Sequence, residues 1–209
     1  MDYWNNIQTE KSWNVLQELK KLKETKFDFI VIGGWAAFLW TNLHKSKDID
    51  IVIKDYKDID FLKKNYNLNK NDNLKKYEIK IDEIDIDIYV PFYSRLAIPC
   101  EDIKKYATKI QGFEVVKPEI LLILKQGAEK DRESSVKGEK DRIDIMTLLM
   151  FTEINFKEYF SLLKRYNLEE YYSRLRNIIN NFKAIKYLDI NPREFKIRKN
   201  KLIENLKKI

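Results

Sequence analysis

The stretch FIVIGGWAAFLWTNLHKSKDIDIVI, Phe29 to Ile53, changes character three times. An apolar segment ends in a glycine pair, a second apolar segment follows, and a charged segment then leads into Asp-Ile-Asp. A glycine pair between a strand and a helix lets the backbone approach an anion closely, and the helix dipole favours a negative charge there. We therefore interpret Gly33 and Gly34 as a cradle for phosphate groups, placed just before a strand that carries two carboxylates.

The tripeptide Asp-Ile-Asp occurs three times, at 48–50, 58–60 and 85–87. The copy at 58–60 precedes FLKK in a helical setting, where acids favour the helix start, so we interpret it as structural. The other two copies lie in predicted strands, where residues two apart share a face. Two carboxylates on one face repel each other unless a cation lies between them, and Mg²⁺ takes oxygen ligands. The alternative for either strand copy is the solvent-facing side of an antiparallel sheet.

The composition is typical of a folded protein with short loops. Among 209 residues, 35% are charged, and there are only 5 glycines and 4 prolines. A single Cys100 rules out a disulfide within the chain, and a single His44 argues against histidine metal sites and Ser-His-Asp triads. The N-terminus lacks the signal-peptide pattern, and no apolar run approaches the ~20 residues that span a bilayer. We expect a cytoplasmic protein that does not associate with membranes.

Strands are expected only in the first 116 residues, and helices dominate the rest. This order predicts an α+β domain followed by a helical one. The segment 67–76 is expected to be a polar loop. The expected strands are 27–32, 49–53, 77–81, 84–90 and 112–116, and the expected helices are 9–25, 35–43, 57–66, 101–107, 118–130, 139–151, 155–166, 168–182 and 192–207.

The segment VIGGWAAFLW…HKSKDIDIVI resembles the core motif of the nucleotidyltransferase superfamily, in its minimal and AbiEii-like toxin branch. The family pattern is Gly-Gly or Gly-Ser, a helix, Arg-x-Thr-x-Asp-hydrophobic-Asp, and a third acid on a later strand. By this resemblance the glycines are Gly33 and Gly34, and the first two acids are Asp48 and Asp50. Ser46 stands where the family has threonine and keeps the hydroxyl group.

The arginine position and the third acid of the family pattern need separate comment. His44 stands where the family has arginine, and Lys45 and Lys47 are the neighbouring positive charges. The resemblance implies Asp87 as the third acid, with Asp85 as the alternative.

The resemblance extends into the helical part, where PEILLILKQGAEKDRES…KGEKDRIDIMTLL is similar to the family's Lys, Arg and Lys-Asp-x-x-Asp elements. These elements fall on Lys125, Arg132, Lys140, Asp141 and Asp144. The resemblance implies that Lys125 contacts the triphosphate, and the alternative is a solvated lysine on an apolar helix. It also implies a nucleotidyltransferase-like catalytic domain over 1–116, with a mixed β-sheet flanked by helices. A helical domain with a basic C-terminal tail would occupy 117–209.

The implied activity is transfer of a nucleoside monophosphate from an NTP such as ATP to a hydroxyl acceptor, with Mg²⁺ or Mn²⁺ as cofactor. Two such ions can clamp the attacking and leaving oxygens in line. The alternative is a catalytically silent module that binds a nucleotide or a partner. The resemblance also implies a toxin role with an antitoxin partner. The catalytic and metal-binding residues would be Asp48, Asp50 and Asp87, and the nucleotide-binding residues Gly33, Gly34, Ser46 and Lys125.

The C-terminal tail holds most of the net charge of +7, because 181–209 contain nine Lys and Arg residues against three acids. Basic runs attract phosphate backbones, which favours RNA as the acceptor, with a protein acceptor as the alternative. A solvated helix face is the simpler interpretation of the charge. Aromatic residues interleave with this region, and most of them are expected in the core. They are Tyr159, Phe160, Tyr166, Tyr171, Tyr172 and Tyr187.

Overall fold

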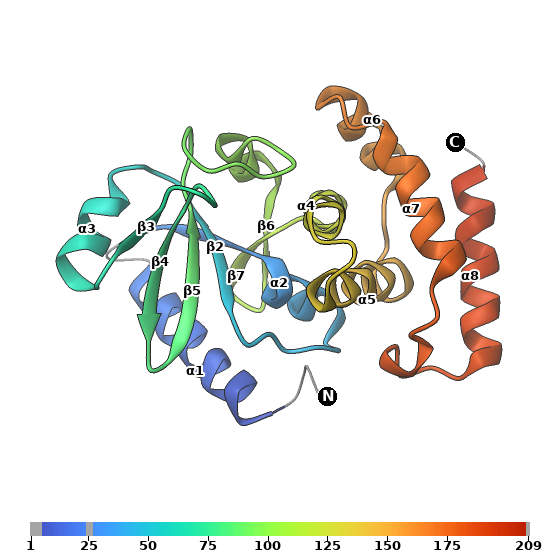
Figure 1. Ribbon diagram of the computed structural model, residues 1–209, viewed down its shortest axis with the longest axis horizontal. Helices are drawn as coiled ribbons and strands as arrows, with labels where there is room; N and C mark the ends of the chain where they lie inside the picture. Colours follow the sequence, from blue (N-terminus) through green and yellow to red (C-terminus); the bar gives the residue numbers. More distant parts are fainter. Residues whose placement is uncertain (1–5, 24–26, 208–209) are drawn as a thin grey trace. The chain divides into compact units, whose positions relative to one another are not determined.

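The computed structural model describes residues 6–23 and 27–207 of the chain. These residues divide into two compact units, Met1–Lys117 and Pro118–Ile209 (Figure 1). The first unit contains a β-sheet with helices, and the second is helical. The predicted helix at 9–25 is found as α1, and its last predicted turn falls outside the described residues.

The first unit contains seven strands within the described ranges. Its elements are α1 (Ile7–Lys23), β1 (Phe29–Ile32), α2 (Gly33–Thr41), β2 (Ile49–Ile53), α3 (Asp58–Asn65), β3 (Asn69–Asn71), β4 (Lys76–Ile81), β5 (Ile84–Tyr89), the 3₁₀ helix η1 (Cys100–Tyr106), β6 (Ala107–Ile110) and β7 (Phe113–Val116).

The seven strands form one mixed sheet in the order β3-β4-β5-β2-β1-β7-β6. Strand β1 pairs antiparallel with β2 and parallel with β7, and β2 runs parallel to β5. The parallel pairing brings together β2 and β5, which are far apart in sequence. The predicted α+β class, with a mixed sheet flanked by helices, is confirmed.

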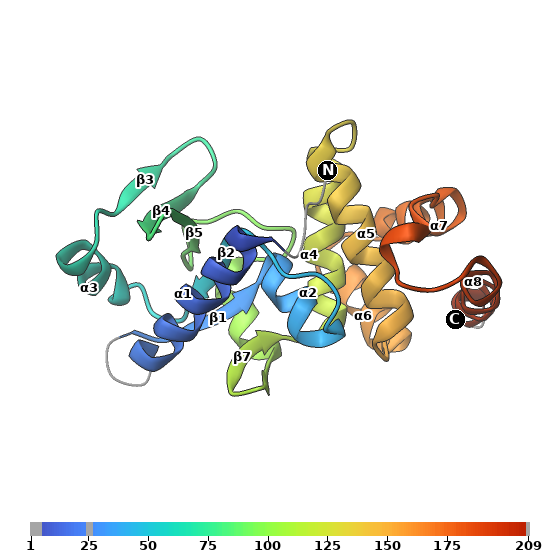
Figure 2. The same cartoon turned by 90° about the horizontal axis from the view of Figure 1, so that it is seen from below.

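One side of the sheet is apolar, because isoleucines occupy alternate positions along β2 and β5. Ile49 and Ile51 are fully buried, whereas Asp50 between them is partly exposed. Helices α1 and α2 lie together on one side of the sheet (Figure 2). They meet through Trp13 and Trp35, whose ring centroids are 5.1 Å apart. The polar side chains of β2 and β5 therefore project from the opposite side.

Two strands and one helix differ from the prediction. The expected polar loop at 67–76 contains β3, strand β6 was not expected, and the helix expected at 101–107 is the 3₁₀ helix η1. Both β3 and β6 lie at the edges of the sheet. Edge strands are short and often polar, so they lack the apolar alternation that marks a central strand.

The second unit is built from five α-helices among its described residues. Tyr159 on α6 is fully buried and donates a hydrogen bond to Oε1 of Gln126 on α4, at 2.5 Å. Tyr171 on α7 is also buried, which confirms the core interpretation for these two aromatic residues. The elements are α4 (Pro118–Asp131), α5 (Val136–Phe151), α6 (Phe156–Arg165), α7 (Glu170–Asn181), the 3₁₀ helix η2 (Ile185–Tyr187) and α8 (Pro192–Lys207).

A search of the described helices finds none with the length and apolar character needed to cross a membrane.

Candidate active site

The first glycine of the pair lies directly against the second aspartate of the motif. Ile32 at the end of β1 pairs with Asp50 on β2, so Gly33, the next residue, begins α2 beside the carboxylate. A β-carbon at position 33 would lie 2.1 Å from Oδ2 of Asp50, and Gly33 has a φ of +65°. Both the space and the backbone conformation therefore require glycine here.

The second glycine lies against the serine of the motif in the same way. A β-carbon at Gly34 would lie 2.5 Å from Oγ of Ser46, a buried residue. The structure thus brings together Gly33, Gly34 and Ser46, the three residues predicted to hold phosphate groups, at the N-terminus of α2. Asp50 lies at the same place.

The carboxylates of β2 and β5 are neighbours across the sheet. Asp50 lies opposite Asp87 in the parallel pairing, so both side chains project from the same face. The Asp87 side chain is 22% exposed. Burial and, secondly, the negative charge of Asp50 raise the pKa of Asp87 from 3.8 to about 6. Asp50 therefore lies close enough to Asp87 for its charge to disfavour ionisation of Asp87.

A third carboxylate, Glu78, extends this pair into a row. Glu78 on β4 lies opposite Asp87 in the antiparallel pairing of β4 with β5. Neighbouring strands lie about 4.8 Å apart, so Asp50, Asp87 and Glu78 occupy adjacent positions on three strands. We call these three carboxylates the acidic row. The sequence interpretation missed Glu78. The hairpin could have indicated it, because residues equally distant from a two-residue turn face each other.

Lysine 76 lies within this row and was also not anticipated. Its Nζ is 2.5 Å from Oδ2 of Asp87 and 3.0 Å from Oε1 of Glu78. The Lys76 side chain is only 12% exposed. Burial acts to lower the pKa of Lys76, but the hydrogen bonds that its ammonium donates to Asp87 and Glu78 outweigh burial and raise it, so the lysine stays protonated. An ammonium group therefore neutralises part of the acidic row.

The remaining predicted acids have different environments. Asp48 lies just before β2 and is half-buried, and it has no hydrogen-bond or ion-pair partner in the described part of the chain. Asp85 is 62% exposed and pairs with Lys80 at 3.2 Å. The strand register therefore makes Asp87, and not Asp85, the direct neighbour of Asp50.

The copy at 58–60 lies apart from the acidic row. Both Asp58 and Asp60 are in the first turn of α3. Asp58 accepts a hydrogen bond from the backbone amide of Asp28, just before β1, whereas Asp50 pairs at the other end of β1. Asp58 therefore ties α3 to the beginning of the strand, in place of the helix-capping bond that we expected.

The acidic row has the ligand type that Mg²⁺ and Mn²⁺ prefer, because all its donors are carboxylate oxygens. Within residues 6–23 and 27–207, however, no three His, Cys, Asp or Glu side chains are arranged to hold a metal ion. The positively charged group that contacts Asp87 is the ammonium of Lys76. The row fits a cation chemically, and the ammonium of Lys76 already contacts one of its carboxylates.

Near the phosphate cradle, Lys45 pairs with Glu10 on α1 at 2.6 Å. The ion pair partly neutralises the charge of Lys45, one of the two lysines that follow the position of the family's arginine.

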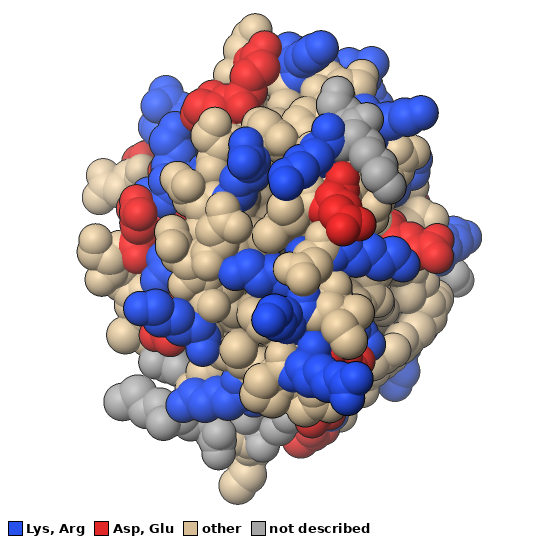
Figure 3. All heavy atoms as spheres, turned by 90° about the vertical axis from the view of Figure 1, so that its right-hand side faces the viewer, with Lys and Arg blue, Asp and Glu red and all other residues tan. Residues whose placement is uncertain are grey.

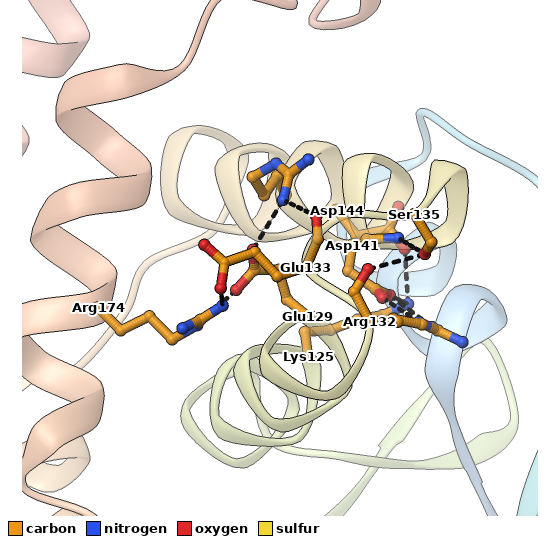
Figure 4. Close-up of polar contacts among 10 residues, drawn as sticks. Lys125, Glu129, Arg132, Glu133, Ser135, Asp141, Asp144 and Arg174 are labelled. Carbon is orange, nitrogen blue, oxygen red and sulfur yellow. Dashed lines mark hydrogen bonds and ion pairs between the residues drawn. The ribbon is translucent and has the colours of Figure 1, made fainter.

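Four of the five motif residues of the second unit form an ion cluster, in which Lys125, Asp141 and Asp144 are buried and Arg132 is partly exposed (Figure 4). Lys125 on α4 lies 2.6 Å from Asp144 and 3.5 Å from Asp141, and all three side chains are at most 8% exposed. Arg132 makes two hydrogen bonds to Asp141, at 2.6 and 2.9 Å. The interpretation of Lys125 as a solvated lysine is wrong. Its contact with a nucleotide stays a prediction.

A second ion cluster in this unit was missed at the sequence level. Glu129, which is buried, accepts hydrogen bonds from Arg142 at 2.8 Å and from Arg174 at 2.6 Å (Figure 4). Arg174 also pairs with Glu133 at 3.0 Å. These residues line part of a pocket of about 360 Å³. Because both arginines already have carboxylate partners, we interpret the cluster as a link between α4, α5 and α7.

The basic tail divides into structural and exposed cations. Arg198 donates to the carbonyl of Met150 and pairs with Glu194, and Lys199 donates to the carbonyl of Asn180. The exposed face of α8 carries other cations, which are Arg193, Lys196, Lys201 and Lys207. Figure 3 shows many lysine and arginine side chains, in blue, on the side of the molecule where α7 and α8 lie. Of the four cations in the densest run of the tail, Lys196, Arg198, Lys199 and Lys201, only Lys196 and Lys201 are exposed, and contact of the tail with RNA stays a prediction.

Comparison with solved structures identifies the fold. A candidate nucleotidyltransferase from H. pylori matches 98% of this chain and 98% of its own at 16% identity, with a TM-score of 0.51. JHP933 from Helicobacter pylori matches 97% and 95% at 15% identity, with a TM-score of 0.50. The Megavirus polyadenylate synthase matches 68% of this chain and 32% of its own at 18% identity, with a TM-score of 0.49. No protein-family model and no curated protein sequence matches the chain.

The chain thus has the nucleotidyltransferase-like fold, an α+β unit followed by a helical unit. At these identities the likeness establishes the fold, and the activity is a matter for proposal.

Proposed function

We propose that the protein is a metal-dependent nucleotidyltransferase that moves a nucleoside monophosphate from an NTP to a hydroxyl acceptor. The observation that supports this most is the position of Asp50, which touches the glycine at the start of α2 on one side and faces Asp87 on the other. On a nucleotidyltransferase-like fold, this arrangement joins a phosphate-binding helix start to a pair of carboxylates.

The residues would divide the work as follows. Gly33 and Gly34 let the triphosphate approach the first amides of α2, and the Ser46 hydroxyl donates a hydrogen bond to a phosphate oxygen. Asp50 and Asp87, with Asp48 beside them, would hold Mg²⁺ or Mn²⁺. When bound, the metal neutralises the pyrophosphate leaving group. Asp87 would complete the metal site and help to accept the proton of the attacking hydroxyl.

Labelling of an acceptor tests the activity. The full chain is incubated with each α-³²P-labelled NTP, Mn²⁺ or Mg²⁺, and total RNA or protein extract. We expect label in an acceptor with the wild type, its loss with Asp50→Asn, and its retention with Asp85→Asn. Asp85 is the matched control because it lies on the same face of β5 but pairs with Lys80 and does not face Asp50. Equal activity of the two variants would exclude the proposed site.

A catalytically silent nucleotide-binding module is the second candidate. The ion pair between Lys76 and Asp87 favours it, because the lysine holds one of the proposed metal ligands. A wild-type protein that binds an NTP with Mn²⁺ but labels no RNA, protein or small molecule would identify the silent module.

For the acceptor we propose RNA, on the basis of the exposed cations of α8. We also propose the AbiEii-like toxin branch, with an antitoxin as partner, from the motif resemblance. Induced expression in a bacterial host tests the toxin role. Growth arrest by the wild type and normal growth with Asp50→Asn would support it, and normal growth with both would remove it.

A further inference from the structure

The lysine in the acidic row has an unusual position for a surface strand. Lys76 begins β4, and its ammonium contacts Asp87 at 2.5 Å and Glu78 at 3.0 Å. Glu78 is additionally held by the side-chain amide of Asn71, at 3.1 Å. Removing an ammonium from water is costly unless carboxylates compensate for it, so the two ion pairs explain why this lysine is mostly buried.

The two carboxylates that hold Lys76 differ in their neighbours. Asp87 faces Asp50, the central acid of the proposed site, whereas Glu78 lies one strand farther away. A divalent ion on Asp50 and Asp87 would lie beside the ammonium of Lys76, and two neighbouring positive charges repel each other. Lysine has a flexible four-carbon stem, so its ammonium can leave Asp87 and keep its contact with Glu78.

We propose that Lys76 is a resident counter-ion of the acidic row, which a divalent metal ion must displace from Asp87 towards Glu78. This inference rests on the proposed function, because it concerns metal binding at the same acids. In the metal-free protein, Lys76 offsets the repulsion between Asp50 and Asp87 and keeps the row assembled. The same contact lowers the affinity for free metal ions.

Calorimetric titration of the full chain with Mn²⁺ alone tests the proposal. Lys76→Met keeps the apolar stem and removes the charge, and we expect it to tighten Mn²⁺ binding by about tenfold or more, from the loss of a nearby positive charge. Lys80→Met is the matched control, because Lys80 lies on the same strand but pairs with the exposed Asp85. We expect it to leave the affinity within about twofold, since exposed charges are well screened. Glu78→Gln removes the alternative partner of the ammonium and should weaken Mn²⁺ binding.

A second measurement needs no substitution. Amine acetylation of the wild type is followed by mass spectrometry with and without saturating Mn²⁺. We expect Mn²⁺ to increase the modification of Lys76 several-fold, because its ammonium leaves Asp87, and to leave Lys80 unchanged.

The outcomes separate this proposal from the proposed function. If Lys76→Met binds Mn²⁺ no more tightly than the wild type, or if the reactivity of Lys76 does not change at saturation, the counter-ion role is excluded while the metal site remains. If neither protein binds Mn²⁺, both the metal site and the counter-ion role are excluded.

Discussion

Gly33 and Asp50 share a space that admits only one side chain. A β-carbon on Gly33 would lie 2.1 Å from Oδ2 and 2.8 Å from Cβ of Asp50. The close approach follows from the pairing of β1 with β2, which places Asp50 opposite Ile32, the residue before Gly33. The acid and the helix start are therefore fixed relative to each other by the sheet itself.

We expect Gly33→Ala to destabilise the protein. The positive φ costs about 1–2 kcal/mol for a residue with a β-carbon. The overlap with Asp50 adds about 1–3 kcal/mol of strain. Urea unfolding of the full chain measures the sum, and a loss smaller than about 1 kcal/mol would contradict the close packing.

Gly34 offers the matched comparison. A β-carbon there would also meet a side chain, but the backbone of Gly34 has no positive φ. A β-carbon there would lie 2.5 Å from Oγ and 2.8 Å from Cβ of Ser46. We expect Gly34→Ala to be destabilising alone and largely compensated by Ser46→Gly. Adding Asp50→Gly to Gly33→Ala should recover only part of the stability lost by Gly33→Ala, because the positive φ at position 33 remains.

The raised pKa of Asp87 predicts that the difference in stability between Asp87→Asn and the wild type depends on pH. Because its pKa of about 6 lies above the ordinary 3.8, the folded protein holds this proton more tightly than the unfolded chain. Its stabilising contribution is therefore present below about pH 4 and is lost as the pH rises through about 6. Asp87→Asn stays neutral, so it should be more stable than the wild type at pH 7, by about 1–3 kcal/mol. Its advantage should vanish near pH 4.

The groups that face Asp87 supply the control. Asp50 and Glu78 act to raise its pKa, and Lys76 acts to lower it. Asp85→Asn removes an exposed carboxylate of the same strand that does not face Asp50, so it isolates the effect of position 87. Parallel stability curves for Asp87→Asn and the wild type would contradict the raised pKa.

A variant of Lys125 separates its structural role from the predicted nucleotide contact. Lys125→Met leaves Asp144 buried without its ammonium partner, and we expect a loss of about 3–5 kcal/mol in stability, as for other broken buried ion pairs. Asp144→Asn should also be destabilising. If Lys125→Met lowers NTP affinity and leaves the unfolding free energy unchanged, the lysine acts on the nucleotide and not in the core.

Binding of RNA should depend on the exposed cations of α8. We expect the quadruple change of Arg193, Lys196, Lys201 and Lys207 to Gln to weaken single-stranded RNA binding. It should also flatten the dependence of log affinity on log salt by about 2.8, or 0.7 per phosphate contact. Arg198→Gln is the contrasting variant. It should lower stability, because this arginine holds Met150 and Glu194. An unchanged salt slope in the quadruple variant would favour a protein acceptor.

The central elements were predictable from the sequence because their residues alternate strongly. Strand β2 has its predicted bounds, and the Asp82–Glu83 turn joins β4 to β5 as expected, with φ of +46° and +68° at the two residues. Local patterns also placed Gly33 at the strand-to-helix junction. The short polar edge strands β3 and β6 carry no such pattern. Each lies at an edge of the sheet and pairs with one neighbouring strand only.

The composition of the acidic row was only partly predictable. The alternation along β5 places Asp85 and Asp87 on one face but does not choose between them. That choice depends on the parallel register of β2 with β5, and the two strands are separated by α3, β3 and β4. The role of Lys76 was equally hidden, because a lysine beside a polar loop is ordinarily solvated. Only the three-dimensional contacts show that its ammonium is held by Asp87 and Glu78.

The two-residue turn at Asp82–Glu83 makes the chemistry of this protein inseparable from its folding. The turn sets which residues of β4 face β5, and β5 in turn aligns Asp87 with Asp50. Deleting one residue of the turn would shift β4 against β5 by one position, so that Lys76 and Glu78 would move from the polar side of the sheet to the apolar side. The same shift would turn the buried Tyr77 and Ile79 away from the core, so the core and the acidic row would be disturbed together. Such a deletion is therefore expected to lower the free energy of unfolding and to break the ion pair between Lys76 and Asp87 in one step.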